Sequence, residues 1–254
     1  MRTVPLSVGH AHDIASLHVR GINTGFISSL GIDFVSALYE AIAKSASSFG
    51  FAIEENNKVL GFVTFTTSLN KLYKSVILKK GWRFALLLAA KMFSLQRIKK
   101  ILETLFYPSR VKKMNLPSAE LLSIAVDPAI CHKGLGTALV RQSLHRCREL
   151  GLDRVKVLVA ADNEPANRMY AKCGFKLVGQ IDNHGVPSNI YEAKVDATST
   201  QETLPSKVTA SAPVVKPTVE TASTAAVCQA PALLILMAGF ILAKIRRACN
   251  KTRP

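Results

Sequence analysis

The chain has 254 residues and is 48% hydrophobic, which is enough to bury the core of one substantial domain and leave residues for an appendage. Its formal net charge of +16 indicates an anionic partner, such as nucleic acid, a lipid surface or a small acidic molecule. The cysteines number five, form no C-x-x-C pair and accompany no histidine cluster, so we expect a reduced, intracellular chain without structural zinc. The N-terminal sequence also lacks the continuous apolar run of a secretory signal.

The N-terminal part of the chain predicts two helices and a β-hairpin. Apolar residues recur at helical spacing in residues 11–22, with Asp13 near the helix start, and more strongly in residues 32–45. Residues 49–55 and 59–67 are apolar stretches joined by the turn sequence "NNK", which is typical of a hairpin. A pair of helices is therefore expected before the first paired strands.

A strongly basic segment follows the hairpin. From Lys71 to Lys113 it contains twelve Lys and Arg residues and one acidic residue, Glu103, so it carries most of the positive excess. It predicts two helices, of which the first, "GWRFALLLAAKMF", is apolar nearly all round and the second is amphipathic. Nucleic-acid binding is not expected, because the segment is strongly apolar and lacks interleaved exposed aromatic residues.

Three interpretations of the basic segment stay open. In the first, it recognises an anionic acceptor molecule. In the second, Trp82, Phe84 and residues 86–88 lie in a membrane surface while the lysines contact anionic headgroups. In the third, the segment packs on the sheet and leaves a solvated basic face.

The following region alternates strands with helices. Apolar strand stretches end at Asp127 and Asp162, and each is followed by a helix that a glycine closes, Gly151 or Gly174. Such alternation predicts an α/β fold. We expect strands at residues 119–128, 155–162, 175–182 and 189–195, and helices at residues 137–150 and 164–174.

Gly134 and Gly136 lie where a strand gives way to a helix, in the stretch "VDPAICHKGLGTALV". Glycines at this place let backbone N–H groups approach an anion at the helix N-terminus, where the helix dipole favours negative charge. The stretch therefore predicts a phosphate-bearing ligand, although two glycines at this spacing also occur in ordinary tight turns.

Two motifs together resemble the GCN5-related N-acetyltransferase (GNAT) superfamily. "LLSIAVDPAICHKGLGTALV" is similar to the family's strand, pyrophosphate-binding loop and helix, and "ADNEPANRMYAKCGF" is similar to its strand-end Asn, Tyr-bearing helix and closing Gly-Phe. The motifs cover residues 120–175, and a looser resemblance covers residues 1–195. Cys131 departs from the Gln or Arg with which the family loop commonly begins. The resemblance implies an α/β fold with a GNAT-type mixed central sheet flanked by helices, in which residues 70–115 form a basic helical insertion.

The resemblance also implies that acetyl-CoA binds as the acyl donor and that no metal ion takes part. Backbone N–H groups of the loop would hold the pyrophosphate, and the strand before it would offer backbone groups to the pantetheine arm and the carbonyl oxygen. Asn163 would contact the cofactor or, alternatively, cap a helix. The expected cofactor-binding residues are Ile124, Ala125, Val126, Cys131, His132, Lys133, Gly134, Leu135, Gly136, Thr137 and Asn163.

Acetyl transfer to an amine needs a base for the amine and a proton for the departing thiolate. Tyr170 matches the family tyrosine that can protonate the CoA sulfur, and its alternative role is aromatic packing beneath the loop. Glu120 matches the catalytic glutamate of histone-acetyltransferase-like members, and its alternative role is that of a solvated residue at a strand start. Asp162 and a water-mediated base stay open. Leu158 stands where protein N-terminal acetyltransferases often carry an acid, which argues against that relationship.

The acceptor is less defined than the donor. His184 and Asn189 lie in the last hairpin, which often borders the acceptor pocket in this superfamily, and are weak candidates for acceptor contacts. The leading hypothesis is an N-acetyltransferase for a primary amine of a small, anionic acceptor such as an amino sugar. Acetylation of protein lysines or N-termini, and a non-catalytic acyl-CoA sensor or scaffold at a membrane, are the alternatives. The oligomeric state stays open.

The composition changes after residue 195. Residues 196–226 are rich in Thr, Ser, Ala and Pro without any period, which predicts a disordered linker. A segment from about Ala225 to Ala243 just reaches a spanning length, and its apolar part, residues 227–243, includes "PALLILMAGFILA". Residues 244–254 form a basic tail. This C-terminal hydrophobic segment predicts a membrane anchor, spanning or interfacial, that leaves the enzyme domain on the cytosolic face of a membrane. Without such an anchor the chain would be cytoplasmic.

Overall fold

A computed structural model describes most of the region that precedes the expected linker. The described residues are 1–22, 27–72, 74–76, 78, 83–84, 115–130, 134–183 and 185–195. Most of the basic segment, the loop residues 131–133 and the expected linker, anchor and tail (196–254) lie outside these ranges.

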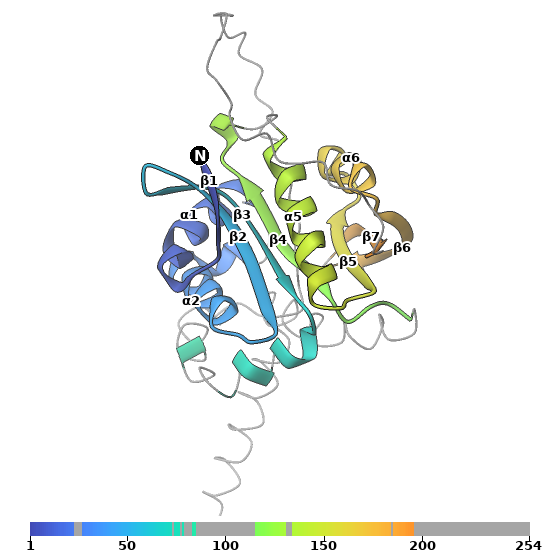
Figure 1. Cartoon of the computed structure of the whole chain (residues 1–254), viewed down its shortest axis with the longest axis horizontal. Helices are drawn as coiled ribbons and strands as arrows, with labels where there is room; N and C mark the ends of the chain where they lie inside the picture. The colour runs from blue at the N-terminus through green and yellow to red at the C-terminus, as the bar shows by residue number, and fades with distance from the viewer. Residues whose placement is uncertain are drawn as a thin grey trace, which may run out of the picture.

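One mixed sheet organises the described residues, with its seven strands in the order β1-β2-β3-β4-β5-β7-β6 (Figure 1). Neighbouring strands are antiparallel except for β4 and β5, which are parallel. The predicted α/β fold with a mixed central sheet is confirmed. The strands are β1 (Arg2–Pro5), β2 (Ser48–Glu55), β3 (Lys58–Thr66), β4 (Glu120–Val126), β5 (Arg154–Ala160), β6 (Lys176–Asn183) and β7 (Val186–Lys194).

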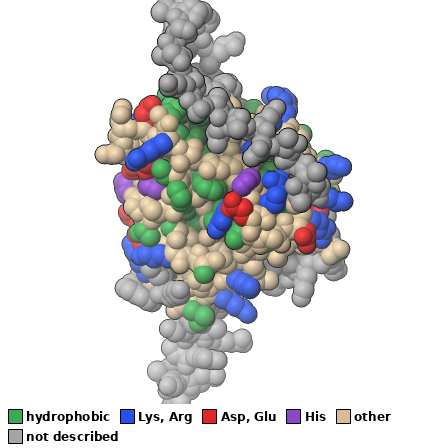
Figure 2. Space-filling view, viewed as in Figure 1, with side chains coloured by type: hydrophobic (Ala, Val, Ile, Leu, Met, Phe, Trp, Pro, Cys, Tyr) green, Lys and Arg blue, Asp and Glu red, His purple; other side chains and the backbone are tan. Residues whose placement is uncertain are grey.

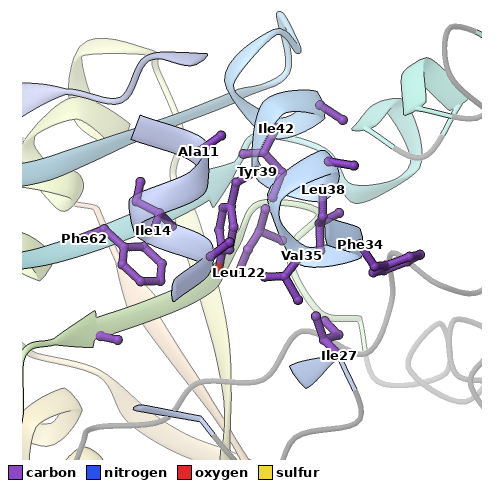
Figure 3. Packing of buried hydrophobic residues seen from close by; sticks show 14 of the residues in the cluster. Ala11, Ile14, Ile27, Phe34, Val35, Leu38, Tyr39, Ile42, Phe62 and Leu122 are labelled. Atoms are coloured by element: carbon purple, nitrogen blue, oxygen red, sulfur yellow. The ribbon is translucent and has the colours of Figure 1, made fainter. Parts of the chain in front are cut away.

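Helices cover both faces of the sheet. One cluster of buried side chains joins α1 and α2 to residues such as Phe62 and Leu122 (Figure 3), and a second joins α5 and α6 to residues such as Val63 and Leu121. Sequence neighbours fall in opposite clusters because successive strand side chains point to opposite faces. The helices are α1 (Ala11–Gly21), α2 (Ile32–Ala43), α5 (Leu135–Glu149) and α6 (Glu164–Lys172), with short 3-10 helices at Val8–His10, Ser28–Leu30 and Pro128–Ile130.

Strand β4 separates from its neighbour β5 midway. It pairs with β3 along its whole length, with a bulge at Leu122, which has no partner residue in β3. It pairs with β5 only through Glu120 and Leu121. The two parallel strands therefore diverge from residue 122 onward, toward the end of the sheet at which α5 begins.

The described part of the basic segment contributes to the core. Leu72, Val76 and Phe84 are buried in the cluster that α1 and α2 cover. The ring of Phe84 is fully buried, and its centroid lies 5.3 Å from that of Phe34 in an edge-to-face arrangement. Phe84 therefore does not lie in a membrane surface, and the expectation that this segment packs on the fold is confirmed at these positions. Trp82 and residues 86–88 lie outside the described ranges.

Among the described residues, no helix is both long and apolar enough to cross a lipid bilayer. Residues 227–243, the expected anchor, lie outside the ranges to which this finding applies.

Gly50 is required by a close approach between β2 and β3. A Cβ atom added to it would lie 2.4 Å from the backbone oxygen of Val63 and 3.2 Å from Cδ2 of Leu6, and the backbone oxygen cannot yield. We expect Gly50→Ala to lower the free energy of unfolding by about 1–3 kcal/mol, measured by urea denaturation. Gly61→Ala is the matched control, because its Cβ would meet nothing closer than 3.4 Å. Equal stabilities of the two variants would contradict the expectation.

Candidate active site

The N-terminus of α5 has the geometry of an anion-binding helix start. Gly134 is the N-cap residue and adopts a left-handed conformation (φ 73°), and the N–H of Ala138 donates to its carbonyl oxygen at 2.9 Å. Glycine suits this conformation because it has no Cβ. The first turn of α5 contains no acidic side chain. The first backbone N–H groups of the helix therefore meet no negative side chain of their own turn.

Gly136 lies in the same turn and brings α5 close to α6. A Cβ atom on Gly136 would lie 3.0 Å from the sulfur of Met169. Leu135 and Thr137 are half-buried beside it. The remaining expected loop residues, Cys131, His132 and Lys133, lie outside the described ranges.

The strand that leads to this loop supplies the second part of the site. Ile124 and Ala125 are buried and Val126 is half-buried, and all three lie beyond the point at which β4 stops pairing with β5. Their backbone pairs on the other side with β3. Residues 124–126 are therefore paired with β3 on one side and are not paired with β5 on the other.

Two asparagines fix α6 to the end of β5. The side-chain oxygen of Asn163 accepts from the N–H of Ala166 at 3.2 Å, so the alternative role of Asn163, that of a helix cap, is confirmed. The side-chain amide of Asn167 donates to the carbonyl oxygens of Ala160 and Asn163, and its oxygen accepts from Asn189 at 2.9 Å. Asn167 was not among the expected site residues, although its place one turn after Asn163 on a short helix was visible in the sequence.

Tyr170 lies on the inner side of α6. It is fully buried, with its ring centroid 5.5 Å from that of Phe175 and 6.4 Å from that of Tyr191. The packing role considered for Tyr170 is therefore present. Its role as a proton donor stays a prediction.

Glu120 is not a solvated residue. Its side chain is fully buried, and its Oε2 lies 3.2 Å from Nζ of Lys156, its register partner on β5. The ammonium group of Lys156 also donates to the carbonyl oxygen of Pro117. Among the described residues, neither carboxylate oxygen of Glu120 has a hydrogen-bond partner, so Oε2 contacts Lys156 as an ion pair and Oε1 has no hydrogen bond. A buried ion pair of this kind was not expected, because nothing in the sequence indicated that Lys156 faces Glu120.

The other residues named from the sequence as a possible base or as acceptor contacts do not form one cluster with Glu120. Asp162 is exposed, and Asn189 accepts from Gln180 as well as donating to Asn167. His184 lies outside the described ranges. Within those ranges, no group of three or more His, Cys, Asp or Glu side chains has the geometry to hold a metal ion.

A row of buried polar side chains crosses the opposite face of the sheet. Nδ1 of His18 lies 2.6 Å from the hydroxyl of Tyr39, which lies 2.8 Å from the hydroxyl of Ser123, which in turn lies 3.0 Å from the hydroxyl of Thr64. Burial lowers the pKa of His18 from its ordinary value to about 4. The imidazole is therefore neutral near pH 7.

The burial of His18 predicts a loss of stability in mild acid. Its pKa is about 4 in the folded chain and ~6.5 when unfolded, so the unfolded chain binds more protons between these values. The stabilising contribution of the neutral, buried His18 to the free energy of unfolding is fully present above pH 6.5. It falls by about 2 kcal/mol when the pH is lowered to 5. His18→Asn lacks this titration, so we expect its urea midpoint to fall less than that of the wild type between pH 7 and pH 5. Equal falls of the urea midpoint in the wild type and in His18→Asn would contradict the assignment of this pH dependence to His18.

A hollow of about 480 Å³ lies elsewhere, between the edge of β2 and the second half of α5. Its walls combine Phe49 and Phe51 with His145, Arg146 and Glu149. Figure 2 shows hydrophobic side chains beside basic, acidic and histidine side chains on this face. These residues of α5 follow Gly134 by at least two turns, so the hollow is separate from the helix N-terminus.

Comparison with known proteins agrees with this geometry. A model of the acetyltransferase (GNAT) family matches residues 23–175, which is more than half of the chain. The chain belongs to the GNAT family. Members of this family carry acetyl groups from acetyl-CoA, and the matched range contains β4, the loop, α5 and α6.

Relatives that are similar to this chain in sequence include two bacterial mycothiol acetyltransferases. A mycothiol acetyltransferase from Beutenbergia cavernae is 32% identical over 77 residues, which are 30% of this chain and 26% of that protein. A mycothiol acetyltransferase from Saccharomonospora viridis is 40% identical over 62 residues, which are 24% of this chain and 20% of that protein. The chain therefore spans about a quarter or less of the length of these relatives.

A solved structure supports the fold. A GNAT-family acetyltransferase from Desulfovibrio desulfuricans superposes with a TM-score of 0.50 and 16% sequence identity, covering 77% of this chain and all of that one. At this identity the likeness concerns the fold alone. It agrees with the mixed sheet and its flanking helices.

Proposed function

We propose that the chain is an N-acetyltransferase that moves the acetyl group of acetyl-CoA to a primary amine of a small, anionic acceptor such as an amino sugar. The observation that carries the proposal is the divergence of β4 from β5 directly beside the N-terminus of α5. An extended thioester-bearing arm fits along the freed side of β4 while its diphosphate meets the helix start.

The cofactor roles follow the chain from β4 into α5. Backbone groups of Ile124, Ala125 and Val126 bind the pantetheine arm and the thioester carbonyl. Backbone N–H groups of the loop and of the first turn of α5 bind the pyrophosphate, and His132 and Lys133 add positive charge. The residues proposed for the loop and first turn are Cys131, His132, Lys133, Gly134, Leu135, Gly136 and Thr137, with Asn163 as a further cofactor contact.

The reaction needs a neutral amine. An alkyl amine has a pKa of ~10.4, so its neutral form costs about 4–5 kcal/mol near pH 7. We assign the base to Glu120, acting through water at the oxygen that Lys156 does not face. Tyr170 gives a proton to the departing CoA sulfur.

A small acceptor is favoured over a protein substrate by the names of the relatives, which are mycothiol acetyltransferases. An anionic acceptor is favoured by the net charge of +16. The proposed place of action is the cytosolic face of a membrane, with residues 1–195 as the enzyme domain, 196–226 as a linker and 227–243 as the anchor.

The test is acetylation of pooled amines by the full chain. Acetyl-CoA is supplied with nucleotide amino sugars, free amino sugars, polyamines and peptides, and mass spectrometry detects the gain of one acetyl group. We expect a product among the amino sugars. A product only among the peptides would replace the proposal with protein acetylation, and acetyl-CoA binding without any product would favour a non-catalytic sensor.

Tyr170→Phe tests the proposed acid in the same assay. It removes only the hydroxyl from a buried ring, so we expect the turnover rate to fall about 100-fold while acetyl-CoA affinity changes little. Tyr191→Phe is the matched control, since its ring packs against that of Tyr170 and has no proposed role in proton transfer. If Tyr170→Phe and Tyr191→Phe had equal turnover rates, Tyr170 would have a packing role only.

A further inference from the structure

The buried row of His18, Tyr39, Ser123 and Thr64 links four elements of the fold. His18 belongs to α1, Tyr39 to α2, Ser123 to β4 and Thr64 to β3. Exposed fractions are 3% for His18, 1% for Tyr39, 6% for Ser123 and 0% for Thr64. Hydrogen bonds in such a dry environment hold their partners more firmly than the same bonds at the surface.

The row ends at the place where β4 changes its course. Ser123 directly follows the bulge at Leu122 and pairs with Thr64 in register. It also lies just beyond Leu121, the last residue through which β4 pairs with β5. Because β4 no longer pairs with β5 here, Ser123 is held by its pairing with β3 and by the hydrogen bond to the hydroxyl of Tyr39.

The hydrogen bonds of the row can run in either of two consistent directions. If the hydroxyl of Thr64 donates to the carbonyl oxygen of Ser123, which lies within 3.5 Å, then Ser123, Tyr39 and Nδ1–H of His18 each donate to the next member of the row. If it donates to the hydroxyl of Ser123 instead, every donation runs the other way and Nδ1 of His18 accepts from Tyr39. Every hydroxyl proton in the row is then used, so the orientation of each side chain depends on its neighbours.

His18 is unsuited to accept the proton of the acceptor amine. Its imidazole is 3% exposed and its Nδ1 is hydrogen-bonded to the hydroxyl of Tyr39, so it does not meet an acceptor amine. A role of the row in acetyl transfer must therefore act through geometry.

We propose that the row formed by His18, Tyr39, Ser123 and Thr64 positions the β4 bulge, so that the backbone N–H groups after Ser123 meet the acetyl group of acetyl-CoA. The inference rests on the proposed function and names positioning residues for it. These side chains do not touch the substrate, since they lie on the face covered by α1 and α2. They act on it through the backbone of Ile124 to Val126.

The affinities for acetyl-CoA and CoA report on the positioning of β4 without an acceptor. If β4 holds the acetyl carbonyl, the wild type binds acetyl-CoA more tightly than CoA. Tyr39→Phe and Thr64→Val remove one link each without changing side-chain shape, so we expect both to bind CoA within twofold of the wild type and to lose the preference for acetyl-CoA. Thr64→Ser keeps the hydroxyl and is expected to keep the preference. Calorimetric titration of the full chain with each ligand measures these affinities.

A matched control separates positioning from loss of stability. Thr66→Val also removes a buried hydrogen bond from β3, the one donated to the carbonyl oxygen of Ser47 at 2.7 Å, but Thr66 is not part of the row. It is expected to keep the preference for acetyl-CoA. In the acetylation assay, Tyr39→Phe and Thr64→Val are expected to lower turnover at least tenfold, and Thr66→Val and Thr64→Ser less than threefold.

Failure of the proposed function and failure of the positioning role give different binding results. A folded wild type that binds neither ligand would overturn the proposed function and this inference with it. A wild type that binds acetyl-CoA and CoA equally, or row variants that keep its preference and turnover, would overturn the inference and leave the proposed function intact. Loss of preference in Thr66→Val as well would reduce the row to a general contribution to stability.

Discussion

Glu120→Gln is expected to destabilise the fold strongly as well as to impair catalysis. The substitution leaves the ammonium group of Lys156, which is 4% exposed, without its buried carboxylate partner. Breaking a buried pair from one side lowers the free energy of unfolding by about 3–5 kcal/mol, because the remaining charge is uncompensated. Urea denaturation of wild type and variant measures the difference.

A second substitution separates the structural from the catalytic contribution. Glu120→Gln combined with Lys156→Met removes both charges, so we expect the double variant to be more stable than Glu120→Gln alone. Turnover should stay low in the double variant if Glu120 is the base. Recovery of turnover together with stability would show that Glu120 acts only through its pair with Lys156. A Glu120→Gln variant as stable as the wild type would contradict the buried pair itself.

Thr137→Glu is expected to weaken acetyl-CoA binding by about tenfold or more. Thr137 is the third residue of α5, so the new carboxylate would lie beside the proposed diphosphate site. Two unit charges about 8 Å apart repel by about 2 kcal/mol at an effective dielectric constant of about 20. The same carboxylate favours the helix itself, because it interacts with the positive end of the helix dipole, so thermal stability should not fall.

Thr137→Gln has the same shape without the charge and is the control. We expect it to bind acetyl-CoA more tightly than Thr137→Glu does, and the gap to narrow at high salt, where the charges are screened. Equal affinities of the two variants would place the diphosphate away from the start of α5.

The elements with a clear period were predicted well from the sequence. Helices α1 and α2 and the hairpin of β2 and β3 lie within a few residues of their expected bounds, because each repeats its apolar residues at the spacing of its own geometry. Strand β1 was missed. Its four residues are too short to show alternation, and it forms by pairing with β2, with Arg2 contacting Glu54.

Most residues proposed for the cofactor lie in one stretch, 124–137, so the sequence alone could name them, whereas the polar contacts around them could not be predicted. Glu120 and Lys156 meet only because β4 and β5 pair in one register. His18 and Tyr39 are 21 residues apart, and Tyr39 and Ser123 are 84 apart. The helical pattern placed His18 and Tyr39 on helices without indicating that either faces β4. Such contacts depend on the packing of whole elements, which no local pattern contains.

We propose that acetyl-CoA binds where β4 leaves β5 and α5 begins, and the first measurement to make is calorimetric titration of the full chain with acetyl-CoA. We expect saturable binding at one site, weakened in Thr137→Glu and nearly retained in Thr137→Gln. A folded chain that takes up no acetyl-CoA, or that binds it equally in all three proteins, would contradict it.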